Sequence, residues 1–200
     1  LNRNAETHTG STFIIGSERD DLIQGGQGND YLEGRAGNDT FRDEGGYNVI
    51  LGGQGSNTLQ LQSSVKDASF VQDGAGTLYV RDAQGAISMT RDIDTLVSKE
   101  PGLFWGLLKD EVSHSVTANG LVAGGKLTAY ASSTAGTSAD DTLTARSSGD
   151  WLFGHDGNDV LLGGTGNDTF VGGSGNDWLQ SGGGSDTFVF NGAFGHDQIS

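Results

Sequence analysis

A pattern of nine residues recurs eleven times along this chain of 200 residues. Each unit follows the template Gly-Gly-x-Gly-x-Asp-x-apolar-x, and the clearest copies are residues 25–33, 163–171 and 172–180. A fixed short period of this kind is typical of parallel β-helical proteins, in which each repeat packs only on its neighbours. The period therefore constrains the fold more than any other feature of the sequence.

The units form two blocks, residues 16–60 and residues 136–189. Every unit has a large apolar residue at its eighth position: Ile23, Leu32, Phe41, Ile50 and Leu59, then Leu143, Leu152, Leu161, Phe170, Leu179 and Phe188. We expect the first six residues of a unit to form a turn and the last three a strand. The eighth-position side chains should then form a row that points into the roll.

The predicted fold class is all-β, with two right-handed parallel β-rolls of nonapeptide repeats joined by an irregular β-rich segment. The two blocks are separated by a number of residues that is not a multiple of nine, which indicates two separate rolls. Residues 1–15 are expected to be the tail of a preceding domain or an N-terminal cap. Residues 61–135 should bridge the blocks, and residues 190–200 should begin a truncated C-terminal region.

The segment between the blocks carries no repeat. Alternating apolar residues on both sides of residues 82–85 predict a hairpin within residues 76–97. Residues 101–116 are expected to begin as a short helix. Five apolar residues in this stretch are expected to belong to a core: Leu103, Phe104, Trp105, Leu107 and Leu108.

In the second block, the seventh and ninth positions should face away from the roll. One outer face would carry Trp151, Phe153, Val171 and Val189, and the other Val160, Leu162 and Trp178. These residues either reflect the general preference of strands for such side chains on a solvated face or mark a face that is covered.

The chain is strongly acidic, with 26 Asp and Glu residues against 11 Lys and Arg and a net charge of −15. This charge repels nucleic acids and anionic membranes, so neither is an expected partner. No stretch approaches the roughly 20 apolar residues of a membrane span, and we expect no stable membrane insertion. The chain has no cysteine, so bound metal is the expected source of rigidity. No signal peptide is visible, and the sequence reads as a segment of a larger protein.

The turns have the chemistry of a calcium site. Glycine permits positive φ and close backbone approach, so that carbonyl groups point towards an ion, and aspartate adds a carboxylate. Calcium takes 6–8 oxygen ligands, which one turn cannot supply but two stacked turns can. Magnesium prefers a strict octahedral geometry and retains its waters, so it suits these turns poorly. If one coil holds two units, the residues that share a site are Asp21/Asp39, Asp30/Asn48, Asp39/Asn57, Asp141/Asp159, Asp150/Asp168, Asp159/Asp177 and Asp168/Asp186.

We therefore predict several Ca²⁺ ions as the only cofactor. The predicted ligands at the sixth positions are Asp21, Asp30, Asp39, Asn48, Asn57, Asp141, Asp150, Asp159, Asp168, Asp177 and Asp186. The predicted glycine ligands are Gly25, Gly28, Gly34, Gly37, Gly154, Gly157, Gly163, Gly166, Gly172 and Gly175. Sites with Asn48 or Asn57 should be weaker because an amide carries no charge. The turns that begin at Gly16, Gly136 and Ala145 are degenerate copies of the template. Because the strands are short, folding should be coupled to calcium binding.

No catalytic constellation is expected in this segment. The sequence contains neither a Gly-x-Ser-x-Gly elbow nor an HExxH motif. Its four histidines, His8, His114, His155 and His196, are scattered, and its paired carboxylates are already explained as metal ligands.

The repeats resemble those of the RTX family, whose members are exported by type I secretion. Four segments also resemble the C-terminal domain of family I.3 bacterial lipases, a group that includes polyurethanases: residues 4–59, 74–93, 99–118 and 149–164. The resemblance implies an upstream α/β-hydrolase domain with calcium-dependent triacylglycerol lipase activity and a C-terminal secretion signal. No triad residue of that family falls on this chain. As partners it implies that catalytic domain and the type I secretion apparatus, and as location the extracellular space. The module would fold on export and stabilise the enzyme.

Two other functions stay open. An RTX adhesin or polysaccharide-binding module would carry a row of basic or aromatic residues on one outer face, but Arg146 is the only Lys or Arg of the second block. The C-terminal domain of an RTX metalloprotease usually has one repeat block, and the long middle segment argues against it.

Overall fold

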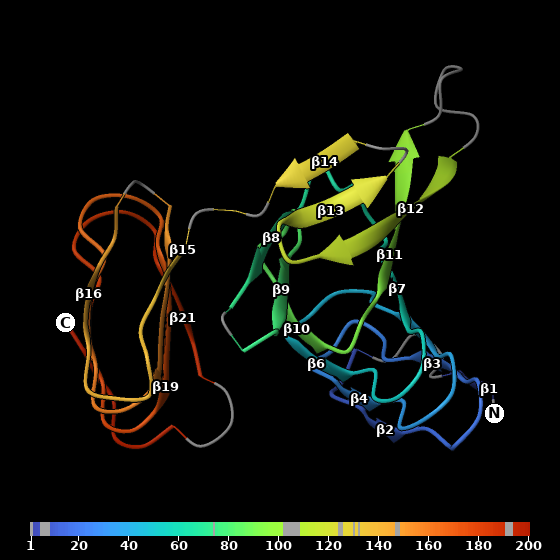
Figure 1. Cartoon of the computed structure of the whole chain (residues 1–200), viewed down its shortest axis with the longest axis horizontal. Helices are drawn as coiled ribbons and strands as arrows, with labels where there is room; N and C mark the ends of the chain where they lie inside the picture. The colour runs from blue at the N-terminus through green and yellow to red at the C-terminus, as the bar shows by residue number, and fades with distance from the viewer. Residues whose placement is uncertain are drawn as a thin grey trace. The chain divides into compact units, whose positions relative to one another are not determined.

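The computed structural model describes residues 2–4, 9–73, 75–101, 109–123, 126–129, 131, 133–146, 149–190 and 194–200. These residues form 22 strands and no helix, so none of them provides a helix long and apolar enough to cross a membrane. The chain divides into two compact units, Leu1–Tyr130 and Ala131–Ser200, which are described separately (Figure 1). The predicted all-β fold class with parallel β-rolls is confirmed.

The first unit begins as a roll of two parallel sheets. One sheet contains β1 (Asn2–Asn4), β3 (Leu22–Gln24), β5 (Thr40–Arg42) and β7 (Thr58–Gln60), and the other contains β2 (Phe13–Ile15), β4 (Tyr31–Glu33) and β6 (Asn48–Leu51). The chain alternates between the two sheets, so that Ile23 pairs with Phe41 and Phe41 with Leu59. Each partner lies 18 residues further along, which means that one coil holds two nine-residue units.

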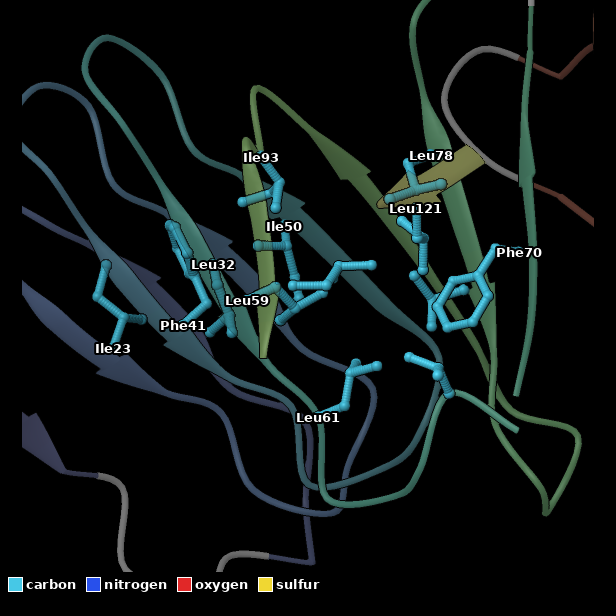
Figure 2. Packing of buried hydrophobic residues seen from close by; sticks show 13 residues of the cluster. Ile23, Leu32, Phe41, Ile50, Leu59, Leu61, Phe70, Leu78, Ile93 and Leu121 are labelled. Atoms are coloured by element: carbon cyan, nitrogen blue, oxygen red, sulfur yellow. The ribbon is translucent and has the colours of Figure 1, made fainter. Parts of the chain in front are cut away.

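The eighth-position side chains form the core of this roll. Ile23, Phe41, Ile50 and Leu59 are fully buried, and Leu32 is 1% exposed. Figure 2 shows that these side chains point into the space between the two sheets. Period-nine spacing places one apolar residue per strand on this inward face, which explains how strands of only three residues are held together.

The segment after the first block extends both sheets of this unit. Strand β10 (Ile87–Arg91) pairs in parallel with β6, and β11 (Thr95–Pro101) pairs in parallel with β7. Antiparallel strands then follow on each sheet: β8 (Ser69–Gln72), β9 (Leu78–Arg81), β12 (Lys109–Thr117), β13 (Gly120–Ala123) and β14 (Lys126–Ala129). Phe70, Leu78 and Leu121 of these strands, with Leu61 and Ile93 of the connecting segments, join the same apolar cluster as the roll (Figure 2).

The predicted hairpin is present, because β9 and β10 are antiparallel and the Asp82 carboxylate accepts the N–H groups of Gln84 and Ala86 in the turn. The described part of residues 101–116 contains strands and no helix: Pro101 ends β11, and residues 109–116 belong to β12, which pairs with the whole of β11 through residues 109–115. The start of the predicted helix, residues 102–108, lies outside the described residues. The apolar residues Leu103, Phe104, Trp105, Leu107 and Leu108 lie outside the described residues.

The second unit is a roll of two parallel sheets of four strands each (Figure 1). One contains β15 (Ser133–Ala135), β17 (Trp151–Asp156), β19 (Thr169–Ser174) and β21 (Thr187–Val189), and the other β16 (Thr142–Thr144), β18 (Val160–Leu162), β20 (Trp178–Gln180) and β22 (Gln198–Ile199). Its buried apolar cluster consists of Leu143, Leu152, Leu161, Phe170 and Leu179, with Phe188 partly buried against it.

The outward positions of this roll differ between its two sheets. Trp151, Phe153 and Val171 are at most 5% exposed, so a solvated face does not describe them. The rings of Trp151 and Phe153 stack at 5.9 Å between centroids. Trp178, on the other sheet, is 48% exposed, as an outward position on a solvated face should be.

Candidate metal centre

Stacking of the coils brings every predicted pair of sixth-position residues together. In each pair, the backbone N–H of the earlier residue donates to Oδ1 of the residue 18 positions later. The N···O distance is 2.8 Å for Asp21/Asp39, Asp141/Asp159, Asp150/Asp168, Asp159/Asp177 and Asp168/Asp186, and 2.9 Å for Asp30/Asn48 and Asp39/Asn57. In the later residue of each pair, one side-chain oxygen is therefore used to align successive coils.

The second oxygen of these carboxylates is left over. Among the described residues, Oδ2 is buried without a hydrogen-bond partner in Asp30, Asp39, Asp159, Asp168 and Asp177. These five residues are at most 3% exposed. A buried charged oxygen without a partner is costly, because it has lost its hydration and gained nothing in return. The repeated occurrence of the same orphaned atom indicates that a cation completes the site.

Backbone carbonyl groups line the same space. A β-carbon at Gly154 would lie 2.3 Å from Asp159 Oδ2 and 2.3 Å from the carbonyl oxygen of Gly172 in the next coil. At Gly34 the corresponding distances are 2.2 Å to Asp39 Oδ2 and 2.6 Å to the carbonyl oxygen of Gly52. The first glycine of a unit is thus required because the space beside it is lined by oxygen atoms of two stacked turns. Carboxylate and carbonyl oxygens without nearby donors are the ligands that calcium prefers, so these residues fit the ion.

The second position of a unit distinguishes these turns from others. The second-position residue has positive φ at Gly164 and Gly173, and also at His155 (φ 79°). In these turns no second-position N–H donates to Oδ2 of the repeat aspartate, which has no hydrogen-bond partner among the described residues. Ser17, Thr137 and Arg146 occupy the same position without positive φ, and their N–H groups donate to the carboxylate of their own turn. The Ser17 and Thr137 hydroxyls donate as well, each at 2.9 Å. The turns that begin at Gly16 and Gly136 therefore satisfy Oδ2 of their aspartates internally. In the turn that begins at Ala145, Asp150 Oδ2 is satisfied in the same way, whereas Asp150 Oδ1 is buried without a hydrogen-bond partner among the described residues.

Burial changes the protonation of the orphaned carboxyl groups. Loss of hydration raises the pKa above its ordinary value for Asp30, Asp39, Asp159 and Asp177. Neighbouring carboxylates in the stack raise the pKa of Asp39, Asp159 and Asp177 further. The protein alone disfavours the ionised form at these positions, and a bound divalent cation reverses that preference.

The structure adds residues that the sequence analysis missed. Asp197 Oδ1 accepts the N–H of Asp177 at 3.0 Å, so Asp197 occupies the sixth position of a further turn. Residues 192–200 match the template with Gly192, Gly195, Asp197 and Ile199, but two additional residues shift them out of phase. Fifth-position side chains form a second ladder, in which Asn158 Oδ1 accepts the N–H of Asn176 at 3.0 Å. Its signal in the sequence was the recurrence of Asn before the repeat Asp.

This arrangement defines a class of protein, the parallel β-roll in which stacked Gly- and Asp-rich turns hold cations between coils. The chain matches the family described as RTX calcium-binding nonapeptide repeat in four copies, over residues 7–41, 34–61, 135–170 and 162–199. It therefore belongs to this family. Repeats of this family bind calcium, and the number of repeats implies several ions.

The chain is also similar to a solved structure, the extracellular lipase LipA from Serratia marcescens. The two share 54% sequence identity with a TM-score of 0.84, over 98% of this chain and 32% of LipA. The chain thus spans about a third of the length of that protein. A comparison with curated proteins yields no match.

Proposed function

We propose that this chain is the calcium-dependent folding module of a secreted triacylglycerol lipase, whose catalytic domain lies elsewhere in a longer protein. The similarity to an extracellular lipase at 54% identity over nearly the whole chain supports this function. LipA extends well beyond the matched part, which leaves room for a separate catalytic domain. The middle segment is included in the match, whereas nonapeptide repeats alone would not distinguish a lipase from other RTX proteins.

One observation carries the proposal, the column of buried aspartate oxygens without a partner among the described residues. Without a cation these carboxylates repel one another and lack hydration, so the rolls should not be stable. Metal binding then supplies folding free energy directly. Because calcium is scarce in the cytosol and abundant outside cells, the module would stay unfolded until export by the type I secretion apparatus and would then fold and stabilise the attached enzyme.

The first test is a calcium titration of the 200-residue chain from a metal-free start, followed by far-UV circular dichroism. We expect a cooperative gain of β signal with calcium and none with an equal concentration of magnesium. A β signal that does not increase when calcium is added, or an equal response to magnesium, would contradict calcium-coupled folding.

A pair of variants then assigns the effect to the proposed sites. Asp168 contributes Oδ1 to the turn of Asp150 and faces the next turn with Oδ2, so Asp168→Ala should weaken calcium binding by at least about tenfold. Asp156→Ala removes the same charge from an exposed position and should leave the midpoint of the titration unchanged. Equal effects of the two variants would mean that general charge, not these sites, governs folding.

The attached activity is tested on the longer protein. Its esterase activity towards triacylglycerol emulsions should survive refolding with calcium and be lost faster on heating when Asp168→Ala is present. Unchanged thermal inactivation would remove the stabilising role and leave calcium binding intact.

A further inference from the structure

The last two units of the first roll carry asparagine at the sixth position, where all nine other units carry aspartate. Asn48 is 2% exposed and Asn57 is fully buried, so their side-chain amides must find partners within the protein. Each amide has one acceptor oxygen and one NH₂ donor group, and the two ends face different neighbours.

The amide oxygen does what Oδ1 of aspartate does in other turns. Asn48 Oδ1 accepts the N–H of Asp30, and Asn57 Oδ1 accepts the N–H of Asp39, each at 2.9 Å. These hydrogen bonds determine the orientation of both amides, since only oxygen can accept from N–H. Each NH₂ group is therefore directed to the other side of its turn, towards the segment that follows in the stack.

The Asn57 amide nitrogen lies where other turns have the orphaned carboxylate oxygen. A β-carbon at Gly52 would lie 2.7 Å from Asn57 Nδ2 and 2.1 Å from the carbonyl oxygen of Asp92. Asn57 Nδ2 donates to that carbonyl at 3.0 Å and to the Gly53 carbonyl at 3.3 Å. The carbonyl group that would face an ion in a consensus turn is thus bound directly by a protein N–H.

In the Asn48 turn the side-chain NH₂ group also donates to protein oxygen atoms, and it has more acceptors than in the Asn57 turn. Asn48 Nδ2 donates to the Gly45 carbonyl at 3.1 Å, to Asp43 Oδ1 at 3.1 Å and to Ser88 Oγ at 3.3 Å. Asp43 stands at the first position in place of the usual glycine, and its other oxygen accepts the Ser88 hydroxyl. In this unit the first position carries the carboxylate and the sixth position carries the amide. Hydrogen bonds from the protein satisfy both oxygens of the Asp43 carboxylate.

We propose that Asn48 and Asn57 end the two calcium columns of the first roll, with the amide NH₂ group taking the place of a further ion. The proposal rests on calcium binding by the preceding turns. The segments bound by these amides lead into β10 and β11, where Ser88 pairs with Asn48 and Thr95 with Thr58. The junction between the roll and its antiparallel extension is therefore closed without metal. In the earlier turns, Oδ2 of Asp30 and Oδ2 of Asp39 have no hydrogen-bond partner among the described residues, and there the proposal retains a calcium ion.

The sharpest test converts the amide into a carboxylate. Asn57→Asp replaces the NH₂ donor with an oxygen that faces the Asp92 and Gly53 carbonyls, with the Asp94 carboxylate bound to the Asn57 N–H nearby. Isothermal titration calorimetry should then count one more calcium ion per chain than in the unmodified protein. Asn38→Asp is the matched control, because Asn38 lies at an exposed fifth position and should add no ion.

An unchanged ion count in folded Asn57→Asp would overturn the proposal. If this variant does not fold, a crystal structure of the unmodified chain grown with calcium decides the question. Ions between the turns at Gly34 and Gly52, with none between Asn57 and Asp92, would support the amide closure, whereas an ion beside Asn57 Nδ2 would refute it. A chain that binds no calcium at all would instead refute the proposed function.

Discussion

In the first unit, the inward row of the roll continues into the apolar cluster of the antiparallel strands, whereas in the second unit the row stands alone. Leu61, Phe70, Leu78 and Leu121 enlarge the first cluster, and Asn48 and Asn57 close the end of the first roll with hydrogen bonds. The buried residues of the second cluster are all at eighth positions. The same repeat is therefore joined to a larger apolar core in one unit and not in the other, and the proposed function implies that the second roll relies more on metal.

The largest expected difference appears when calcium is removed. In chelator, residues 131–200 should lose nearly all amide protection, because removal of the ions leaves buried carboxylate oxygens of that roll unpaired and its inward row contains only five buried side chains. Strands β8 to β13 of the first unit should keep more protection because their core is apolar. Hydrogen–deuterium exchange with mass spectrometry measures both regions in one sample, and equal loss of protection in the two units would break the comparison.

A core truncation should also be severe in the second roll. Phe170 is fully buried and stacks on Phe188 at 5.0 Å, so Phe170→Ala should lower the free energy of unfolding by about 3–5 kcal/mol in calcium. Phe13→Ala is the control, since Phe13 is 69% exposed and its loss should change stability by less than about 0.5 kcal/mol. Denaturant unfolding in saturating calcium gives both values, and similar losses would show that the eighth-position row is not the core.

A smaller effect is expected from opening a turn that satisfies its own aspartate. Thr137→Gly removes the hydroxyl that donates to Asp141 Oδ2 and lets this position take positive φ, as Gly173 does. Calorimetry should detect one additional calcium ion per chain in this variant. Thr144→Gly, at an exposed strand position, should change stability without changing the ion count. An unaltered ion count in Thr137→Gly would show that the hydroxyl does not decide occupancy.

The smallest expected effect is a pH dependence of the metal-free chain. Burial raises the pKa of Asp159 and Asp177 above the unfolded value, so the folded metal-free state binds protons more tightly than the unfolded state. The stabilisation is present below the unfolded pKa and is lost as pH rises through the raised pKa. In calcium-depleted buffer, circular dichroism should show more β structure at mildly acidic than at neutral pH. Asp159→Asn should reduce this difference, and a metal-free chain that loses structure on acidification would contradict the sign.

Local chemistry made much of this protein predictable. Position-eight residues such as Leu32 and Leu161 are buried as predicted because one apolar residue per three-residue strand can face only the interior. The 18-residue register is the one expected if one coil holds two units, and the strand pairing confirms it. Asp197 was missed because two additional residues broke the phase of the repeat, although the stack accommodates them and the Asp177–Asp197 hydrogen bond still forms.

What the sequence determined by itself was the repeat, and with it the parallel coils, the inward row and the oxygen-rich turns that suit calcium. Only the tertiary structure decided which turns leave an oxygen free for an ion. That outcome depends on the φ of Ser17 or His155, and on whether a distant residue such as Asp92 or Ser88 reaches the turn. Periodicity specifies contacts between neighbouring repeats, whereas these partners come from segments without a repeat, whose pairing is set by long-range packing.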